Sequence, residues 1–149
     1  METPPFKRTV CACSGCTANC FRQPGYLIPG DLERIEAKLD ADGRSAEKTN
    51  FAASPGGKVI DQRQNTVVVV QTITPARKPD GSCVFLDANR YCTIHEVSPF
   101  GCAYYGQHMT HAEAKRRSMW GMGRILEDDA YRERRREFPE TNIHNPVAR

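Results

Sequence analysis

The chain gathers four of its cysteines within ten residues near one end, and three more follow at wider spacing. The seven thiols are Cys11, Cys13, Cys16, Cys20, Cys83, Cys92 and Cys102. Thiolates held close together bind zinc or iron–sulfur clusters, because soft sulfur ligands suit those metals. The two groups are more than sixty residues apart, so a shared site would close a long loop and couple metal binding to folding.

The spacing of the thiols limits how many metals they can hold. In Cys13-Ser-Gly-Cys16 two sulfurs can point at one metal from a single turn, and Cys20 and Cys11 are near enough along the chain to join them. A zinc ribbon would need a second Cys-x-x-Cys, but eight and nine residues separate the later thiols. Seven thiols exceed the four that one zinc or one cubane cluster needs, so two sites, or one site with spare thiols, are both open.

Two other uses of the thiols agree less well with the sequence. The first five residues lack the basic start and apolar stretch of a signal peptide, so we expect a cytoplasmic protein with reduced thiols rather than a disulfide framework. An odd number of cysteines would also leave one thiol over. A thioredoxin-like redox site would place its Cys-x-x-Cys at the start of a helix after a strand, and no such pattern flanks Cys13 and Cys16.

Length indicates one small domain, and the charge gives no sign of a nucleic-acid partner. The 149 residues suit a single metal-binding domain over 1–138, beginning with an irregular lead-in over 1–10 and followed by an extended tail over 139–149. A net charge of +3 is too small to indicate nucleic acid. The longest apolar run, Val67 to Val70, is too short to cross a membrane. We therefore expect no nucleic-acid or membrane partner; the oligomeric state stays open.

Local patterns predict a helix and a hairpin in the first half of the chain. Asp31 is a suitable N-cap for a short helix that Gly43 ends, with apolar positions at helical spacing at Leu32, Ile35 and Leu39. A polar loop is expected over 44–57. Two strands follow, Lys58–Asp61 and Thr66–Ile73, joined by a hairpin turn over 62–65. The run of valines predicts that the second strand is buried on both faces.

The second half of the chain is predicted to end in helices. Thr110 and Glu113 form a capping box that starts a helix toward Arg124 or beyond. Its apolar face is expected at Met119, Met122, Ile125 and Leu126. Gly121 and Gly123 predict a weak point, where the helix kinks or breaks. Together with the hairpin, these elements indicate a small, irregular, metal-centred α+β domain.

A second helical stretch over about 128–137 carries an arginine run that Pro139 ends. Its arginines are Arg132, Arg134, Arg135 and Arg136. Because glutamates are interleaved with them, we expect a solvated helix with ion pairs at i,i+4 spacing. Docking of an acidic redox partner is the functional alternative. Tyr104 and Tyr105 are expected to shield the metal site from water, and Trp120 to pack in the core.

Five short motifs together point to a known family. They are Cys13-Ser-Gly-Cys16-Thr-Ala-Asn-Cys20, Leu27-Ile-Pro-Gly-Asp-Leu32, Gly81-Ser-Cys-Val-Phe-Leu86, Cys92-Thr-Ile-His-Glu96 and Ser98-Pro-Phe-Gly-Cys102. Over residues 11–105 the chain resembles the YkgJ-type cysteine-cluster family, a zinc- or iron-chelating domain. The resemblance implies metal binding by the thiols that match the family pattern, which are Cys13, Cys16, Cys20, Cys83, Cys92 and Cys102.

The chain departs from the family pattern at two positions. Asn19 stands where the family has its third cysteine, and Ser98 stands where the family usually has an arginine before Pro99. Cys11 is an additional thiol that can compensate for the cysteine missing at Asn19. The ligand set of the first group is therefore open at Cys11 and Asn19.

The leading hypothesis from the sequence is an iron–sulfur protein with one or two [4Fe-4S] clusters. Two clusters would need an eighth ligand besides the seven thiols, for which His95, His108 or an aspartate is a candidate. The role would be electron transfer, or accessory work in maturing or serving a partner enzyme. A zinc-binding structural or interaction module is the alternative. Catalysis at an open cluster iron is a further possibility, but no other catalytic motif stands out, so no catalytic residue is assigned and enzymatic activity is left undecided.

Overall fold

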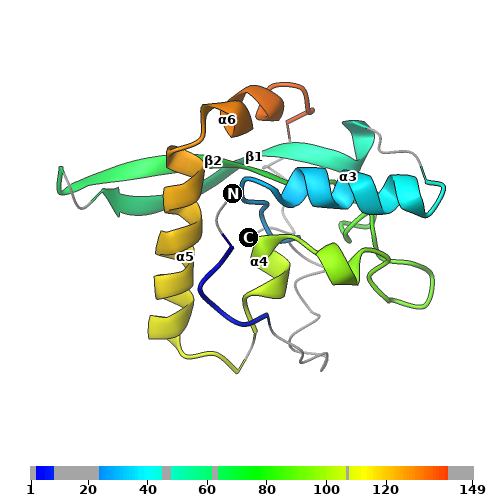
Figure 1. Cartoon of the computed structure of the whole chain (residues 1–149), viewed down its shortest axis with the longest axis horizontal. Helices are drawn as coiled ribbons and strands as arrows, with labels where there is room; N and C mark the ends of the chain where they lie inside the picture. Colours follow the sequence, from blue (N-terminus) through cyan, green and yellow to red (C-terminus); the bar gives the residue numbers. More distant parts are fainter. Residues whose placement is uncertain (1–2, 9–23, 45–47, 62–63, 107, 141–149) are drawn as a thin grey trace.

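The computed structural model describes residues 3–8, 24–44, 48–61, 64–106 and 108–140, in which a β-hairpin packs against short helices (Figure 1). The elements in chain order are α3 (Asp31–Ala41), η1 (Lys48–Asn50), β1 (Phe51–Asp61), β2 (Thr66–Pro75), η2 (His95–Val97), α4 (Phe100–Ala103), α5 (His111–Leu126) and α6 (Asp129–Arg135). Both α5 and α6 contact β2, and α3 contacts η2. The predicted α+β class is confirmed. No helix within the described ranges is long and apolar enough to cross a membrane.

The hairpin is longer than the sequence predicted. Its antiparallel register runs from Phe51 opposite Pro75 to Asp61 opposite Thr66. The predicted loop over 44–57 is therefore wrong from Phe51 onward. The polar Pro-Gly-Gly stretch is accommodated by a bulge, where the register shifts between Ser54 and Gly57. Gly56 is required there, because its φ is 76° and an added Cβ would lie 1.7 Å from the Val70 carbonyl oxygen.

The valines of β2 are not buried on both faces as predicted. Val70 is 1% exposed, but Val67 is 67% and Val69 is 57% exposed. Only the half of the hairpin nearer Phe51 and Pro75 lies in the core, where Phe51, Ile73 and Pro75 are fully buried. A two-stranded ribbon that extends past the helices leaves its turn end in solvent (Figure 1). A run of apolar residues records strand propensity but not how far the neighbouring helices reach.

Helix α3 begins one residue earlier than an Asp31 N-cap would require. Gly30, with φ 97°, is the N-cap, and Asp31 is the first helical residue. The predicted apolar face is confirmed, because Leu32, Ile35 and Leu39 are buried. The helix ends as predicted at Gly43, whose φ is 72°. There the Arg44 N–H donates to the Leu39 carbonyl at 2.8 Å, which completes a Schellman motif.

Asp31 joins the start of α3 to the start of α4. Its buried Oδ2 accepts hydrogen bonds from the N–H groups of Ile28 (3.0 Å) and Phe100 (2.8 Å), and Arg34 pairs with Oδ1. Burial raises the pKa of the Asp31 carboxyl, while the two N–H bonds and the Arg34 charge oppose that rise. Asp31 thus caps the start of α4 and fixes the backbone just before α3, although the two helices begin 69 residues apart in the chain.

Helix α5 starts at the predicted capping residue and continues through both of its glycines. The Thr110 Oγ1 accepts a hydrogen bond from the Glu113 N–H at 3.1 Å. The predicted kink or break is wrong, since α5 is unbroken to Leu126. Gly121 has a packing reason instead, because an added Cβ would lie 2.7 Å from both the Phe100 ring and the Tyr26 hydroxyl.

The arginine run of α6 does more than face solvent. Arg132 pairs with Asp129 and Arg136 pairs with Glu133, but at i,i+3 rather than the predicted i,i+4 spacing. Two further arginines tie α6 to the rest of the domain. Arg135 donates to the backbone carbonyls of the hairpin at Ser54 (2.8 Å) and Thr72 (3.1 Å), while Arg134 pairs with Glu36 of α3 at 3.1 Å.

We expect Asp31→Ala to lower the free energy of unfolding by about 2–4 kcal/mol, because it leaves two buried N–H donors without their acceptor. Asp40→Ala, at an exposed position of the same helix, should change it by less than about 0.5 kcal/mol. Urea unfolding monitored by circular dichroism measures both. Equal values for the two variants would contradict the capping role of Asp31.

Candidate metal centre

Three of the predicted ligands lie in the described part of the chain, each in a different local structure. Cys83 is buried and forms an isolated antiparallel bridge with Arg77. Cys92 is half-buried and forms the same kind of bridge with Leu86. Cys102 is half-buried within α4. The other predicted ligands lie outside the described residues; they are Cys11, Cys13, Cys16 and Cys20.

Side-chain hydrogen bonds shape the turns that precede the first two of these thiols. The Asp80 carboxylate accepts from the Ser82 hydroxyl (2.6 Å) and N–H (2.9 Å), and these bonds lower the pKa of the carboxyl. In the second turn, Asp87 Oδ1 accepts from the N–H groups of Asn89 (2.8 Å) and Tyr91 (3.0 Å). Short polar side chains that bond their own backbone hold such loops in one conformation.

Hydrophobic residues between the thiols anchor these loops to the core. Four are buried, namely Phe85, Leu86, Ile94 and Phe100. Two others, Val84 and Val97, are partly buried and pack against the same core. The loops that carry the cysteines are therefore held both by polar turns and by apolar anchors.

The chain that leaves the first cysteine group crosses directly over α4. The Gly25 N–H donates to Cys102 Sγ at 3.2 Å, and the Gly101 N–H donates to the Tyr26 carbonyl at 2.8 Å. An added Cβ at Gly25 would lie 2.2 Å from the Gly101 carbonyl carbon, so the crossing requires glycine. A backbone N–H aimed at sulfur offsets negative charge there, which suits a metal-bound thiolate.

The chain that enters the first cysteine group is bound to the same region. Arg8 Nη2 donates to the His95 carbonyl and to Ser98 Oγ, both at 2.9 Å, and its guanidinium lies 5.7 Å from the centre of the Tyr104 ring. The lead-in that the sequence predicted to be irregular is thus bound to the domain through Arg8. Both flanks of the 9–23 segment contact the stretch of chain from His95 to Tyr104, which holds Cys102.

Arg117 of α5 also binds the segment before the first cysteine group and the turn after α4. Its Nη1 donates to the carbonyls of Lys7 (3.1 Å) and Tyr104 (2.9 Å), while its Nε donates to Glu113 Oε2 at 2.7 Å. Hydrogen bonds from Arg117 and Arg116 lower the pKa of the Glu113 carboxyl. The Arg117 side chain is only 13% exposed, while its bond to the Lys7 carbonyl lies at the surface.

An aromatic cluster surrounds α4. Phe100 stacks on Tyr104 with ring centres 4.9 Å apart, and it meets Tyr105 edge-on with ring centres 5.8 Å apart. The centre of the Trp120 ring lies 5.6 Å from that of Phe100. Trp120 packs against the core, as predicted. Tyr104 and Tyr105 are half-buried beside the helix that carries Cys102. Their shielding of a metal from water stays a prediction.

The two candidate histidines are exposed. His95 opens η2, and His108 lies between α4 and α5. Within the described ranges, no three His, Cys, Asp or Glu side chains gather as metal ligands would. Whether either histidine completes a ligand set therefore stays a prediction.

Sequence reasoning missed four residues that organise this region. Gly25 and Gly101 carried a signal, since each is a glycine next to a proline or a cysteine, where close backbone approach is common. Arg8 and Arg117 carried none, because the bonds that join the segments run from Arg8 to residues 87 and 90 positions away and from Arg117 to Lys7, 110 positions away.

We expect Arg117→Lys to lower the free energy of unfolding by about 1–3 kcal/mol, because an ammonium cannot reproduce the fork that bonds two carbonyls and a carboxylate. Arg116→Lys is the matched control. Arg116 shares Glu113 and lies over the same Phe6 ring as Arg117, but its side chain is 64% exposed. Urea unfolding followed by Trp120 fluorescence compares them, and an equal change in both would contradict the bridging role.

Comparison with known proteins agrees with this picture. Residues 12–121 match the family model CxxCxxCC, described as "Putative zinc- or iron-chelating domain". Neither a curated protein nor a solved structure matches the chain significantly. The matched range contains six of the seven cysteines and leaves out Cys11. The chain therefore belongs to the CxxCxxCC family of zinc- or iron-chelating domains, which is the YkgJ-type family that its cysteine spacing indicated.

Proposed function

We propose that the chain is an iron–sulfur protein, which holds at least one [4Fe-4S] cluster between its two cysteine groups. The observation that carries this proposal is the hydrogen bond from the Gly25 N–H to Cys102 Sγ. Through this bond, the backbone that follows Cys20 reaches the sulfur of Cys102. Hydrogen bonds from backbone N–H groups to sulfur are among the features that tune such clusters.

The covalent chain supports a shared site. Cys20 precedes Gly25 by five residues, and a stretch of that length spans at most about 18 Å. Cys11 follows Arg8 by three residues, which span at most about 11 Å. Thiols of the first group are therefore tethered near Cys102 from both sides.

The donor set fits a cluster. Thiolates are the usual ligands of [4Fe-4S], and the ligands we assign are Cys13, Cys16, Cys20, Cys83, Cys92 and Cys102, with Cys11 in place of the cysteine missing at Asn19. Seven thiols exceed the four that one zinc ion or one [4Fe-4S] cluster uses, so their number leaves room for a second site. A cytoplasmic location would keep these thiols reduced and able to bind.

The role that we assign is electron transfer or accessory work for a partner enzyme. A bound cluster would supply a centre that takes up and releases single electrons. Cys92 and Cys102 are only half-buried, so a site that includes them would lie near the surface, within reach of a docked protein. A protein partner therefore suits this chain better than a small diffusing substrate of the cluster.

Protein purified without oxygen should be brown and contain iron and sulfide in equal amounts, because a [4Fe-4S] cluster has four of each. Metal and sulfide analysis with electron paramagnetic resonance of the reduced protein checks this. A colourless protein with stoichiometric zinc would overturn the iron–sulfur proposal and leave a zinc module in its place.

Cys16→Ala and Cys102→Ser should each sharply lower the iron and sulfide bound per chain, because both groups contribute to one site. Loss in Cys16→Ala with full retention in Cys102→Ser would show that the groups do not share a cluster. Cys11→Ser is the comparison outside the family match, and we expect it also to lower the metal content. Full retention of metal would mean that Cys11 does not replace the cysteine missing at Asn19.

A further inference from the structure

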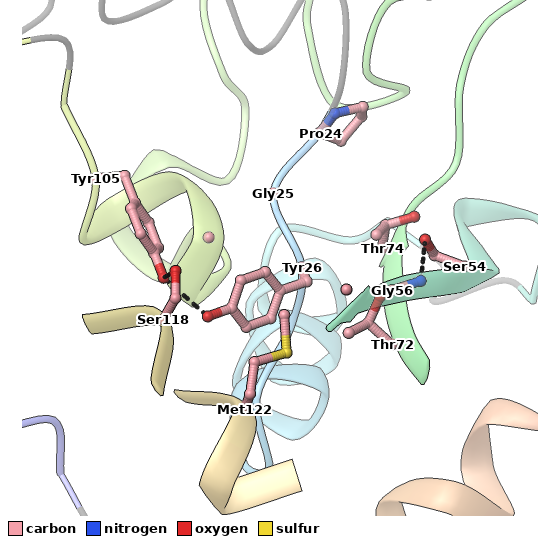
Figure 2. Close-up of a pocket in the computed structure, with 12 residues that line it drawn as sticks. Pro24, Gly25, Tyr26, Ser54, Gly56, Thr72, Thr74, Tyr105, Ser118 and Met122 are labelled. Atoms are coloured by element: carbon pink, nitrogen blue, oxygen red, sulfur yellow. Dashed lines mark hydrogen bonds between the residues drawn. The ribbon is translucent and has the colours of Figure 1, made fainter. Parts of the chain in front are cut away.

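A pocket of about 360 Å³ lies beside the crossing of Gly25 and Gly101 (Figure 2). Its walls come from residues 24–26, the bulge of β1, the end of β2, α5 and the turn after α4. Its volume is in the range of small-molecule sites. No cysteine, histidine or charged side chain is among the described residues that line it, so its chemistry differs from that of the metal centre.

Many of the lining residues carry a hydroxyl. Six of the twelve do so: Tyr26, Ser54, Thr72, Thr74, Tyr105 and Ser118. Figure 2 shows Tyr105 and Ser118 on one side of the Tyr26 ring and the strand residues on the other. Hydroxyls both donate and accept hydrogen bonds, so this lining can satisfy a ligand that does the same.

Three of these hydroxyls form a chain. The Tyr26 and Tyr105 oxygens are 2.9 Å apart, and the Tyr105 and Ser118 oxygens are 2.8 Å apart. Three hydroxyls bring three protons, and the two hydrogen bonds use two of them, so one proton remains for a further acceptor. Burial raises the pKa of both phenols, which keeps the chain protonated and uncharged at neutral pH.

The rest of the lining is apolar or open. Met122 supplies apolar surface next to the Tyr26 ring and Pro24 supplies more beyond Gly25, while Gly56 and Gly57 of the bulge present no side chains. An ionic ligand would lose its hydration here without gaining an opposite charge, which is costly. A sugar ring suits such a lining, because it carries hydroxyls on its edge and C–H groups on its faces.

We propose that this pocket binds a neutral, polyhydroxylated small molecule of the sugar or polyol class. The site is separate from metal chelation and does not depend on whether the metal is iron or zinc. A ligand there would touch Gly25 and Gly101, the two glycines that pack around Cys102. Binding would thus be sensed at the backbone that donates to the Cys102 sulfur.

The test uses the metal-loaded protein and two probes of one ring type, methyl α-D-glucopyranoside and glucuronate. Amide NMR shifts of Gly56 and Gly57 report binding, because both line the pocket on the hairpin bulge. We expect saturable shifts with the neutral probe and at least about tenfold weaker binding of the charged one. No saturable shift with the glucoside, or equal affinity for glucuronate, would overturn the proposal.

Two threonines of β2 provide matched variants. Thr74→Val removes a pocket hydroxyl without changing the size of the side chain, and we expect it to weaken glucoside binding about 3–10-fold. Thr66→Val makes the same change at the exposed far end of the strand and should leave the affinity unchanged. Equal affinity in both variants would refute the site. These shifts can be read whichever metal is bound, so this proposal and the cluster proposal fail separately.

Discussion

The crossing of residues 25–26 over residues 101–102 is the contact on which the rest of the domain depends. The two backbones approach so closely that neither Gly25 nor Gly101 could carry a Cβ without displacement. Their hydrogen bonds place Cys102 against the chain leaving the first cysteine group. Asp31 then bonds the start of α4, and Gly121 lets α5 close over the same helix. A side chain added at Gly25 or Gly101 would push all of these segments apart at once.

Sequence predicted those parts of the fold that are decided locally. The Thr110 cap and the apolar face of α3 rest on residues within one or two turns of each other, and both are confirmed. The start of β1 and the exposure of Val67 and Val69 depend instead on which helices cover the hairpin. Asp31 looked like an ordinary N-cap because its second partner, the Phe100 N–H, is 69 residues away.

The candidate site likewise has parts that the sequence predicted and parts that depend on distant partners. Cysteine spacing was enough to indicate the family, because metal ligation demands particular residue types at particular intervals. Arg8 and Arg117 could not be found in this way, since surface and structural arginines look alike in a sequence. What distinguishes them is that each also bonds a backbone carbonyl of a distant segment, His95 for Arg8 and Lys7 for Arg117, and a carbonyl leaves no signature in the residue type.

The bond from Arg117 to the Lys7 carbonyl has a consequence for biosynthesis. It joins residues 110 positions apart, so it cannot form until most of the chain has left the ribosome. At about 5–20 residues per second, that interval lasts roughly 5–20 s. For most of this interval, from Cys20 onward, the first cysteine group is covalently complete, while the segments that receive its two flanks are still being made. A metal site shared by the two cysteine groups would therefore be completed only after Cys102 has been made.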